Sequence, residues 1–321
     1  MNSKNKIIPI FFAIDDNYAI FLTVALKSIM ATASKDYIYN IHVLSEKLSD
    51  EHISEISSLA NDNFKIYFNN ISETIKGVAD KLQLRDYYTL SIYYRLFIQS
   101  MFPEYDKAIY LDSDLVCLKD ISKFFNINID SYLLAATPEE VMHSVDAFGK
   151  YSEFAVGVKR ENYFNSGILL LNLKKFREEK IEEKFLEMLE VYKFKVAPDQ
   201  DYLNLLCKDM TLLLPAGYNK TPVRLNGFDS KDLFFVHYKI NWKPWKYSGI
   251  MYEKYFWKYA KQTKYYSALL AMRDNYSGSQ KKVDSDSYFN LVKLAKDETI
   301  KFEKLTIFKS LGVKNYGKIA R

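Results

Sequence analysis

Short apolar runs alternate with helical segments over the first third of the chain, and this order restricts the fold more than any other feature. Four runs have the length and the β-branched and aromatic content of buried strands: 7–14, 37–44, 64–68 and 107–111. Three helices are expected between them: 17–33, 49–60 and 87–101. Such alternation is typical of a mostly parallel sheet covered on its faces. The sequence therefore predicts an α/β fold, with Asp16 or Asn17 capping the first helix and Ser49 the second.

The second half of the chain has a less regular order of elements. Short strands are expected at 132–136, 167–173, 212–214 and 233–238. Helices are expected at 174–195, 199–208 and 250–272. Because Ser277, Gly278 and Ser279 interrupt the last helical stretch, we divide the chain into a domain of residues 1–275 and a basic, largely helical tail of residues 276–321.

Charge is concentrated in this tail. Residues 278–321 contain ten Lys or Arg and five Asp or Glu, which gives the tail the whole net charge of +5. The rest of the chain is neutral, so no broad basic surface is expected for nucleic acid. Lysines interleave with apolar residues in the tail, as in helices that bind anionic membranes. Docking to a partner or oligomerisation explains the pattern equally well. The apolar residues are Phe289, Leu291, Val292, Leu294, Ile300, Phe302, Leu305, Ile307, Phe308 and Leu311.

The cysteine content and the N-terminus bear on the compartment. Cys117 and Cys207 are the only cysteines, so no disulfide framework is expected and a reducing compartment is favoured. The first apolar run ends at Asp15 and Asp16 without a small-residue cleavage site, so no signal peptide is predicted. No uncharged run approaches the roughly 20 residues of a membrane span. We expect a cytoplasmic protein, with the tail as a candidate contact to the inner face of the membrane.

Two carboxylates, Asp112 and Asp114, follow the fourth predicted strand and flank Ser113. Carboxylates at the end of a buried strand are costly without a partner, and a hard divalent cation offsets that cost. Mg²⁺ or Mn²⁺ held by one or two carboxylates usually comes with substrate phosphates. A polar turn is the alternative interpretation. Dehalogenase-type phosphatases also carry such a triplet, but after their first strand, and three strands precede it here.

Other polar residues stand near predicted strand ends, where ligands bind in open α/β sheets. Asp15, Asn17 and Tyr18 follow the first strand and suit a nucleoside, although Asp and Asn are also ordinary helix caps. His237 ends a later strand and can join the two carboxylates on a metal, while Lys243 can neutralise phosphate. Further candidates are Asn165, Asp199 and Gln200, the last two of which open a helix after Pro198.

In these segments the chain resembles glycosyltransferase family 8, which includes bacterial lipooligosaccharide α-galactosyl- and glucosyltransferases and glycogenin. The resemblance covers roughly residues 7–260. Six pieces occur in the family's order: Phe12-Ala-Ile-Asp-Asp-Asn-Tyr18, Tyr94-Arg-Leu96, Tyr110-Leu-Asp-Ser-Asp-Leu115, Phe164-Asn-Ser-Gly-Ile168, Asp199-Gln-Asp201, and His237-Tyr238 with Lys243-Pro-Trp245.

This resemblance implies a GT-A fold, a Rossmann-like α/β/α sandwich, with a UDP-sugar donor and Mn²⁺, or Mg²⁺, as cofactor. Asp112, Asp114 and His237 would ligate the metal. The residues implied to bind the nucleotide sugar are Ala13, Asp15, Asn17, Tyr18, Arg95, Asp112, Ser113, Asn165, Asp199, Gln200 and Lys243, and those implied in catalysis are Gln200, Asp199 and Arg95.

The implied reaction transfers glucose or galactose to a glycan, glycolipid or glycoprotein with retention, giving an α-linkage. Gln200 would act as a weak nucleophile, or would orient the sugar while the acceptor attacks from the face that UDP leaves; we favour the second route. Two residues depart from the family pattern: Ile240 replaces a glycine, and Glu139 takes or offsets the place of an acidic sugar contact. A non-catalytic binding protein of the same fold is the alternative function. Another phosphoester metal enzyme is disfavoured because no glycine-rich phosphate loop is present.

Overall fold

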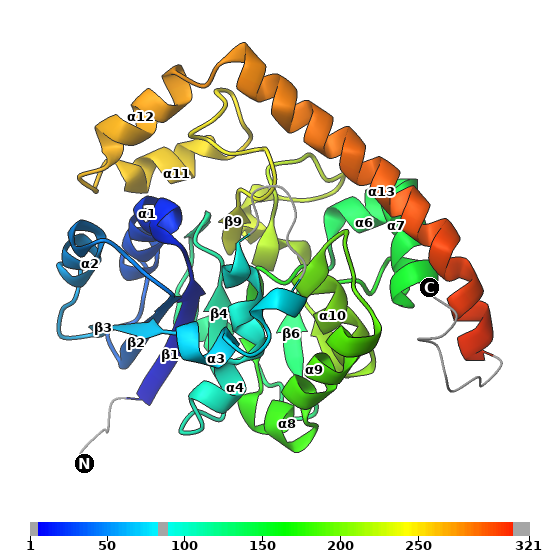
Figure 1. Cartoon of the computed structure of the whole chain (residues 1–321). Coiled ribbons are helices and arrows are strands. Elements are labelled where there is room, and N and C mark those ends of the chain that lie inside the picture. The colour runs from blue at the N-terminus through cyan, green and yellow to red at the C-terminus, as the bar shows by residue number, and fades with distance from the viewer. Residues whose placement is uncertain (1–5, 83–88, 311–321) are drawn as a thin grey trace.

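A seven-stranded sheet forms the centre of the protein (Figure 1). The computed structural model describes residues 6–82 and 89–310, with side chains described over 7–82 and 89–301. The strands of this sheet are β1 (Lys6–Ala13), β2 (Tyr37–Ser45), β3 (Phe64–Asn70), β4 (Ala108–Leu111), β6 (Leu134–Ala136), β7 (Ile168–Leu171) and β8 (Thr211–Leu213). Their order is β3-β2-β1-β4-β7-β6-β8, and only β7 runs antiparallel to its neighbours. The predicted mostly parallel α/β fold is confirmed.

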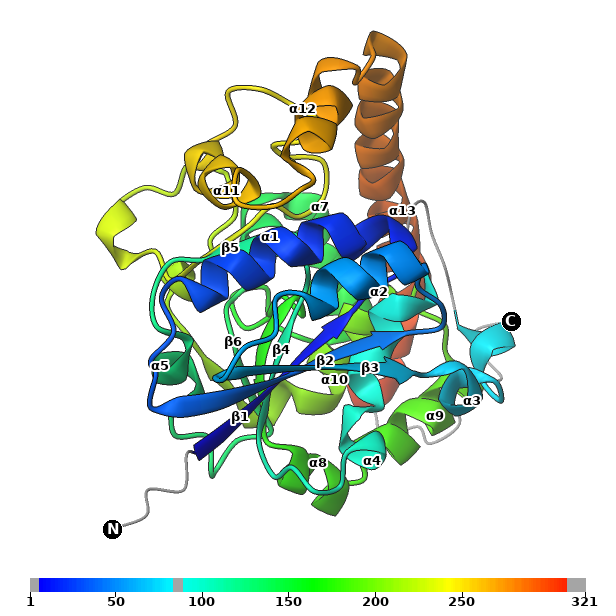
Figure 2. The ribbon, with the colours of Figure 1, turned by 90° about the vertical axis from the view of Figure 1, so that its left-hand side faces the viewer.

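Helices cover both faces of the sheet. Helices α1 and α2 lie on one face, and α4, α8, α9 and α10 lie on the other (Figure 2). The helices are α1 (Ala19–Met30), α2 (Asp50–Ser57), α3 (Ser72–Ile75), α4 (Ile98–Met101), α5 (Ile121–Phe125), α6 (Glu140–Ser144), α7 (Asp146–Tyr151), α8 (Leu173–Glu178), α9 (Ile181–Val191), α10 (Pro198–Cys207), α11 (Glu253–Ala260), α12 (Tyr266–Asp274) and α13 (Gly278–Ser310).

Two apolar clusters on opposite faces of the sheet explain why its strands read as continuous apolar runs. In β4, Ile109 and Leu111 belong to the cluster that contains α1, whereas Ala108 and Tyr110 belong to the cluster that contains α9 and α10. Successive side chains of a strand point to opposite faces, so a strand buried on both faces is apolar throughout. The clusters thus place β4, and the polar residues that follow it, in the middle of the molecule.

A second, two-stranded sheet lies beside the end of β4. Strand β5 (Leu115–Cys117) pairs antiparallel with β9 (Phe235–His237), and Leu115 stands opposite His237. The sequence predicted β9 but read 115–116 only as an apolar run. This pairing brings residues more than 100 positions apart in sequence together at the end of β4.

Several predicted elements differ in extent from those observed. The helix expected at 87–101 is a 3₁₀ helix, η3 (Leu90–Leu96), followed by α4, and residues 87–88 lie outside the described residues. Residues 93–96 are all buried, which a surface helix with one apolar face does not allow. The helix expected at 174–195 divides into α8 and α9 at Lys180, whose φ of 53° is left-handed. The helix expected at 250–272 divides into α11 and α12.

The helix caps follow the predictions in part. Ser49 caps α2 as predicted, because its side chain accepts the backbone N–H of His52 (3.4 Å). The cap at the first helix is different: Asp15 accepts the backbone N–H of Tyr18 (3.2 Å) at a short 3₁₀ turn, η1 (Asp16–Tyr18), that precedes α1. Asp16 instead accepts hydrogen bonds from the backbone N–H of Ser49 and from Nδ1 of His52, both 2.8 Å long. The first turn is therefore anchored to α2.

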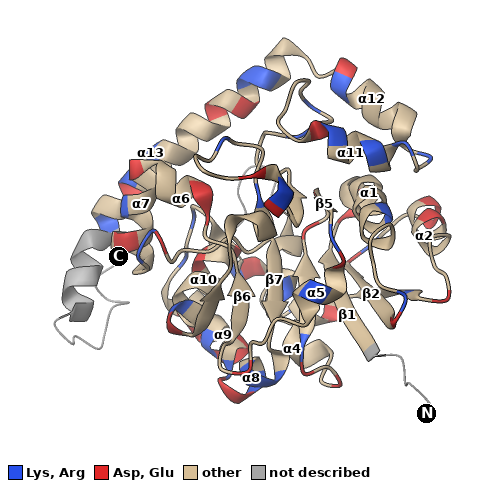
Figure 3. Cartoon of the chain, turned by 180° about the vertical axis from the view of Figure 1, so that it is seen from behind, with Lys and Arg blue, Asp and Glu red and all other residues tan. Residues whose placement is uncertain are grey.

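Helix α13 begins at a capping box and runs along the outside of the domain (Figures 1 and 3). Ser277 Oγ accepts the backbone N–H of Gln280 (3.2 Å), and Gln280 Oε1 accepts the backbone N–H of Ser277 (2.8 Å). The helix packs against α7 and against the π-helical turn η4 (Ser152–Val156). No helix in the described part of the chain is long and apolar enough to cross a membrane.

The apolar residues of α13 divide between the interior and the surface. Leu291, Val292 and Leu294 pack against the main core, and Ala295 is fully buried. Phe289 and Ile300 are exposed. The membrane or partner contact expected of the tail, and its separation as residues 276–321, stay predictions. The other apolar residues expected to make that contact have side chains outside the described residues: Phe302, Leu305, Ile307, Phe308 and Leu311.

Candidate active site

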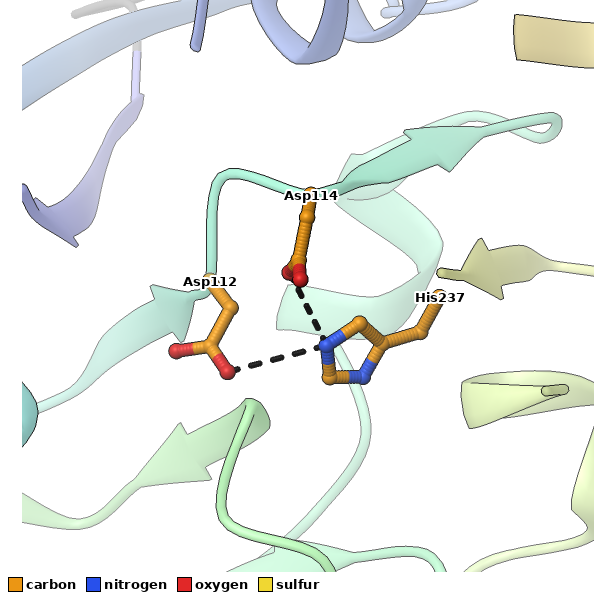
Figure 4. A group of neighbouring side chains, drawn as sticks. All are labelled: Asp112, Asp114 and His237. Carbon is orange, nitrogen blue, oxygen red and sulfur yellow. Dashed lines mark hydrogen bonds and ion pairs between the residues drawn. The ribbon is translucent and has the colours of Figure 1, made fainter. Parts of the chain in front are cut away.

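The ends of β4, β5 and β9 bring three potential metal ligands together. Asp112 follows β4, Asp114 precedes β5, and His237 ends β9 (Figure 4). His237 Nε2 lies 3.1 Å from Asp114 Oδ1 and 3.6 Å from Asp112 Oδ2. One ligand atom from each of the three residues falls within 4.8 Å of the others. Two carboxylates and one imidazole are a donor set suited to Mn²⁺ or Mg²⁺.

A chain of hydrogen bonds fixes which nitrogen of His237 faces the carboxylates. Asn165 Oδ1 accepts the backbone N–H of Gly167 (3.0 Å) and also accepts Nδ2 of Asn219 (2.8 Å). Asn219 therefore presents Oδ1 to His237 Nδ1 at 3.0 Å, and Nδ1 must carry the proton. The Nε2 lone pair is then left to face two carboxylates, and a cation between them satisfies all three groups.

Gly167 supplies the space for this cluster. A Cβ at this position would lie 2.4 Å from both Asp112 Oδ2 and His237 Cε1. Any larger residue would therefore displace two of the three candidate ligands. The backbone at Gly167 also holds the cluster, since its carbonyl accepts the N–H of Asp112 (2.7 Å). The space and the donor set together fit a divalent cation.

Lys243 and Asp114 form a buried ion pair beside this cluster. Lys243 Nζ lies 2.5 Å from Asp114 Oδ2 and also donates to the carbonyl of Tyr238 (3.1 Å). Burial opposes ionisation of Asp114, but the Lys243 ammonium outweighs it and lowers the pKa of this carboxyl. Tyr18 lies nearby, with its ring centroid 5.8 Å from Lys243 Nζ. A carboxylate that stays ionised and an adjacent ammonium suit a cation bound to phosphate.

Arg95 links the paired aspartates to Asp199. Its side chain is only 5 % exposed, and Nη2 lies 3.0 Å from Asp112 Oδ1 while Nε lies 3.3 Å from Asp199 Oδ2. The guanidinium also donates to the backbone carbonyls of Ser166 and Ile92. Burial raises the pKa of Asp199, and Arg95 opposes that rise. Arg95 therefore neutralises the buried Asp199 and the partly exposed Asp112 at once.

Gln200 lies next to Asp199 in a saturated hydrogen-bond network. Its Oε1 accepts the backbone N–H of Ser166 (3.0 Å) and Nδ2 of Asn165 (3.1 Å). Asn165 Nδ2 also donates to Glu139 Oε2 (2.7 Å), and Glu139 forms an ion pair with Lys239. Burial opposes ionisation of Glu139, but Lys239 outweighs it and lowers the pKa of the carboxyl. The network fixes the orientation of the Gln200 amide.

Asp201 lies behind this network and has no cationic partner among the described residues. Its carboxylate accepts the hydroxyls of Tyr163 (2.6 Å) and Tyr151 (2.7 Å) and the backbone N–H of Ala197 (3.0 Å). Complete burial raises the pKa of Asp201 to about 7, and the three donors only partly oppose it.

A pH-dependent stability follows from Asp201. The folded carboxyl holds its proton more tightly than the unfolded one, whose pKa is about 3.9, so its contribution to stability is complete below that value. This contribution to the free energy of unfolding should be lost as the pH rises from about 4 to about 7, so Asp201→Asn should lose less stability than the wild type over this range. Urea unfolding across this pH range measures the effect. The exposed Asp62→Asn variant is the control and should keep the wild-type slope; an unchanged slope in Asp201→Asn would contradict the prediction.

Most of the predicted site residues line one cavity, and two do not. Asp15 and Asn17 are absent from its described lining, and Asp15 is engaged as the cap of η1. The roles assigned to all of these residues stay predictions. The predicted residues on the cavity wall are Ala13, Tyr18, Arg95, Asp112, Ser113, Asp114, Asn165, Asp199, Gln200, His237 and Lys243.

The cavity is also lined by residues that no sequence pattern placed there. Lys239 and Asn241 line it from the loop after β9, and Tyr288 and Leu291 line it from α13. Asn219 supports His237 although it stands in no recognisable motif. These residues come from separate parts of the chain, so only the fold reveals that they meet.

Ile240 keeps the backbone shape that a glycine favours. Its φ of 56° lies in the left-handed region, which is an outlier for a β-branched residue and costs about 1–3 kcal/mol. Ile240 is one of the residues that line the cavity. The departure from the family's glycine therefore leaves the turn left-handed and brings an apolar residue to the cavity wall.

Comparison with known proteins identifies the family. Residues 9–249 match the model of glycosyl transferase family 8. The chain is 28 % identical over 276 residues to a lipopolysaccharide 1,2-glucosyltransferase of Escherichia coli strain K12, with 78 % of each chain covered.

Solved structures share the fold. The galactosyltransferase LgtC, solved with donor and acceptor sugar analogues, gives a TM-score of 0.64 at 24 % identity, with 80 % of this chain and 96 % of that chain covered. The bifunctional glycosyltransferase WbbM gives 0.74 at 23 % identity, with 84 % of this chain covered, and this chain spans about half (52 %) of its length. The architecture is thus that of the GT-A glycosyltransferases. With its family model matched over 9–249, the chain belongs to glycosyltransferase family 8.

Proposed function

We propose that the protein is a metal-dependent retaining glycosyltransferase that moves glucose or galactose from a UDP-sugar to a glycan, glycolipid or glycoprotein, forming an α-linkage. The cluster of Asp112, Asp114 and His237, with Lys243 on Asp114, is the observation that carries this proposal. The lipopolysaccharide glucosyltransferase and the galactosyltransferase among its relatives support a hexose donor and a glycan acceptor.

Charge balance explains how the site favours departure of UDP. A Mn²⁺ or Mg²⁺ ion held by Asp112, Asp114 and His237 would stabilise the negative charge that develops on the β-phosphate. Lys243 supplies a second positive charge at the same place, because it lies against Asp114. The bond between the anomeric carbon and the UDP oxygen breaks, the acceptor oxygen bonds to that carbon, and the acceptor proton passes to the departing phosphate.

The hydrogen bonds of Gln200 favour attack from the face that UDP leaves. An amide oxygen is a weak nucleophile, and Gln200 Oε1 already accepts bonds from Asn165 and Ser166. These donors draw electron density from the oxygen and hold it in place. We therefore assign Gln200 to orienting the transferred sugar, with Asp199 and Arg95 beside it.

A screen of donors tests the proposal. The protein should release UDP slowly from UDP-glucose or UDP-galactose by hydrolysis when Mn²⁺ or Mg²⁺ is present, and EDTA should stop the release. UDP binding without release of sugar would favour the alternative, a non-catalytic nucleotide-sugar-binding protein of the same fold. Neither binding nor release with any UDP-sugar would overturn the proposal. The complete set of Asp112, Asp114 and His237 supports the catalytic function over this alternative.

A further inference from the structure

The charged residues of the cavity wall lie where β4, β5 and β9 end, and many of its apolar residues lie on α6, α7 and α13, which pack together. We call these two parts the polar end and the apolar end. Asp112, Asp114, His237 and Lys243 line the polar end. A charged diphosphate with its cation belongs at this end by charge. The apolar end is therefore available to a group other than the diphosphate. Its lining residues are Val141 and Met142 of α6, Phe148 of α7, and Tyr288 and Leu291 of α13.

A buried carboxylate docks α13 onto the loop that follows β9. Asp284 is 8 % exposed and accepts Lys246 Nζ (3.2 Å) and the hydroxyl of Tyr247 (2.9 Å), while its backbone carbonyl accepts Asn241 Nδ2 (2.8 Å). The hydroxyl of Tyr276 also donates to this carboxylate (2.8 Å). The same loop also carries Lys243 and Ile240, which line the cavity. One loop therefore contacts α13 and contributes residues to the polar end of the cavity.

The docked face of α13 carries Tyr288 into the cavity wall. Residues 284, 288 and 291 recur at the spacing that places side chains on one face of a helix. Tyr288 is half-buried and meets the ring of Phe148 edge-on, with centroids 6.4 Å apart. Among the described residues nothing hydrogen-bonds the Tyr288 hydroxyl. The wall thus presents an aromatic ring and a free hydroxyl.

We infer that Tyr288 of α13 binds the sugar ring of the acceptor. This inference rests on the proposed glycosyl transfer. A pyranose has a face of C–H groups that packs on an aromatic ring, and hydroxyls at its edge that a tyrosine hydroxyl can meet. Ile240 also lines this cavity, so its left-handed backbone brings an apolar residue to the same wall. Helix α13 is then part of the acceptor site rather than an accessory to the domain.

Variants of Tyr288 test the inference through the ratio of two reactions. The probes are p-nitrophenyl α- and β-glucosides and galactosides, each supplied with the UDP-sugar that the wild type hydrolyses. Tyr288→Ala should lower the ratio of transfer to hydrolysis about tenfold, chiefly through a higher KM for the glycoside, because an aromatic contact is lost. Tyr288→Phe should keep most of the ratio. Tyr288→Leu keeps apolar bulk without the ring and should behave as Tyr288→Ala.

The matched control is Ile300→Ala, because Ile300 is exposed on the same helix and lies outside the cavity lining. It should leave both reactions at wild-type rates. An unchanged ratio in Tyr288→Ala, or wild-type hydrolysis without transfer to any of the glycosides, would overturn the inference and leave the proposed function standing. Absence of wild-type hydrolysis would instead count against the proposed function itself.

Discussion

Replacing Asp114 with alanine is expected to abolish the metal-dependent binding of UDP. Asp114 is a candidate metal ligand, and it also holds Lys243 at 2.5 Å and His237 at 3.1 Å. Its removal takes one ligand from the cation and leaves the Lys243 ammonium without its ion-pair partner. Because loss of a supporting partner alone typically weakens metal binding 10–100-fold, loss of this ligand should weaken it on the order of a hundredfold or more.

Isothermal titration of UDP, with Mn²⁺ and with EDTA, measures this effect. The wild type should bind UDP more tightly with Mn²⁺, and Asp114→Ala should show the same weak affinity in both conditions. The matched control is Asp62→Ala, which removes an exposed carboxylate outside the cavity lining and should behave as wild type. If Asp114→Ala kept the Mn²⁺-dependent gain in affinity, the metal site would have to lie elsewhere.

The fold was predictable from the sequence where burial determines the pattern of apolar residues along a strand. Strands such as β1 and β4 are buried on both faces, so they stand out as apolar runs, and their order alone indicates a parallel sheet. Short helices gave no such signal. Helices α5, α6 and α7 have only five or six residues, too few for a helical period to emerge, and η3 buries four consecutive residues instead of one face.

The site was predictable only where its residues occur in motifs. Asp112 and Asp114 stood out because carboxylates follow an apolar strand, and His237 because it ends another. Asn219 and Tyr288 reach the site from the end of a 3₁₀ helix, η6 (Ala216–Asn219), and from the last described helix, and neither stands in a recognisable motif. Their place depends on the pairing of β5 with β9 and on the docking of Asp284, which are long-range contacts that no local pattern records.

Removing the charge of Arg95 is expected to destabilise the protein and to stop glycosyl transfer. The Arg95 side chain is 5 % exposed and pairs with both Asp112 and Asp199, so Arg95→Met would leave both carboxylates without this cation. Removal of one partner from a buried ion pair costs about 3–5 kcal/mol, and we expect the free energy of unfolding to fall by that order. Arg95→Lys keeps the positive charge but not the planar guanidinium with its several donors, so the free energy of unfolding should fall by less than in Arg95→Met.

The pH dependence of this loss distinguishes charge from packing. Burial already raises the pKa of Asp199, and Arg95 opposes that rise, so Arg95→Met should raise the pKa further. A carboxyl with a raised pKa in the folded state contributes stability at acid pH and loses it as the pH rises. Urea unfolding with EDTA should therefore show a larger deficit for Arg95→Met at pH 8 than at pH 5. A deficit that is equal at both values would mean that Arg95 acts through packing on Tyr110, whose ring centroid lies 4.3 Å from the guanidinium carbon, and not through its charge.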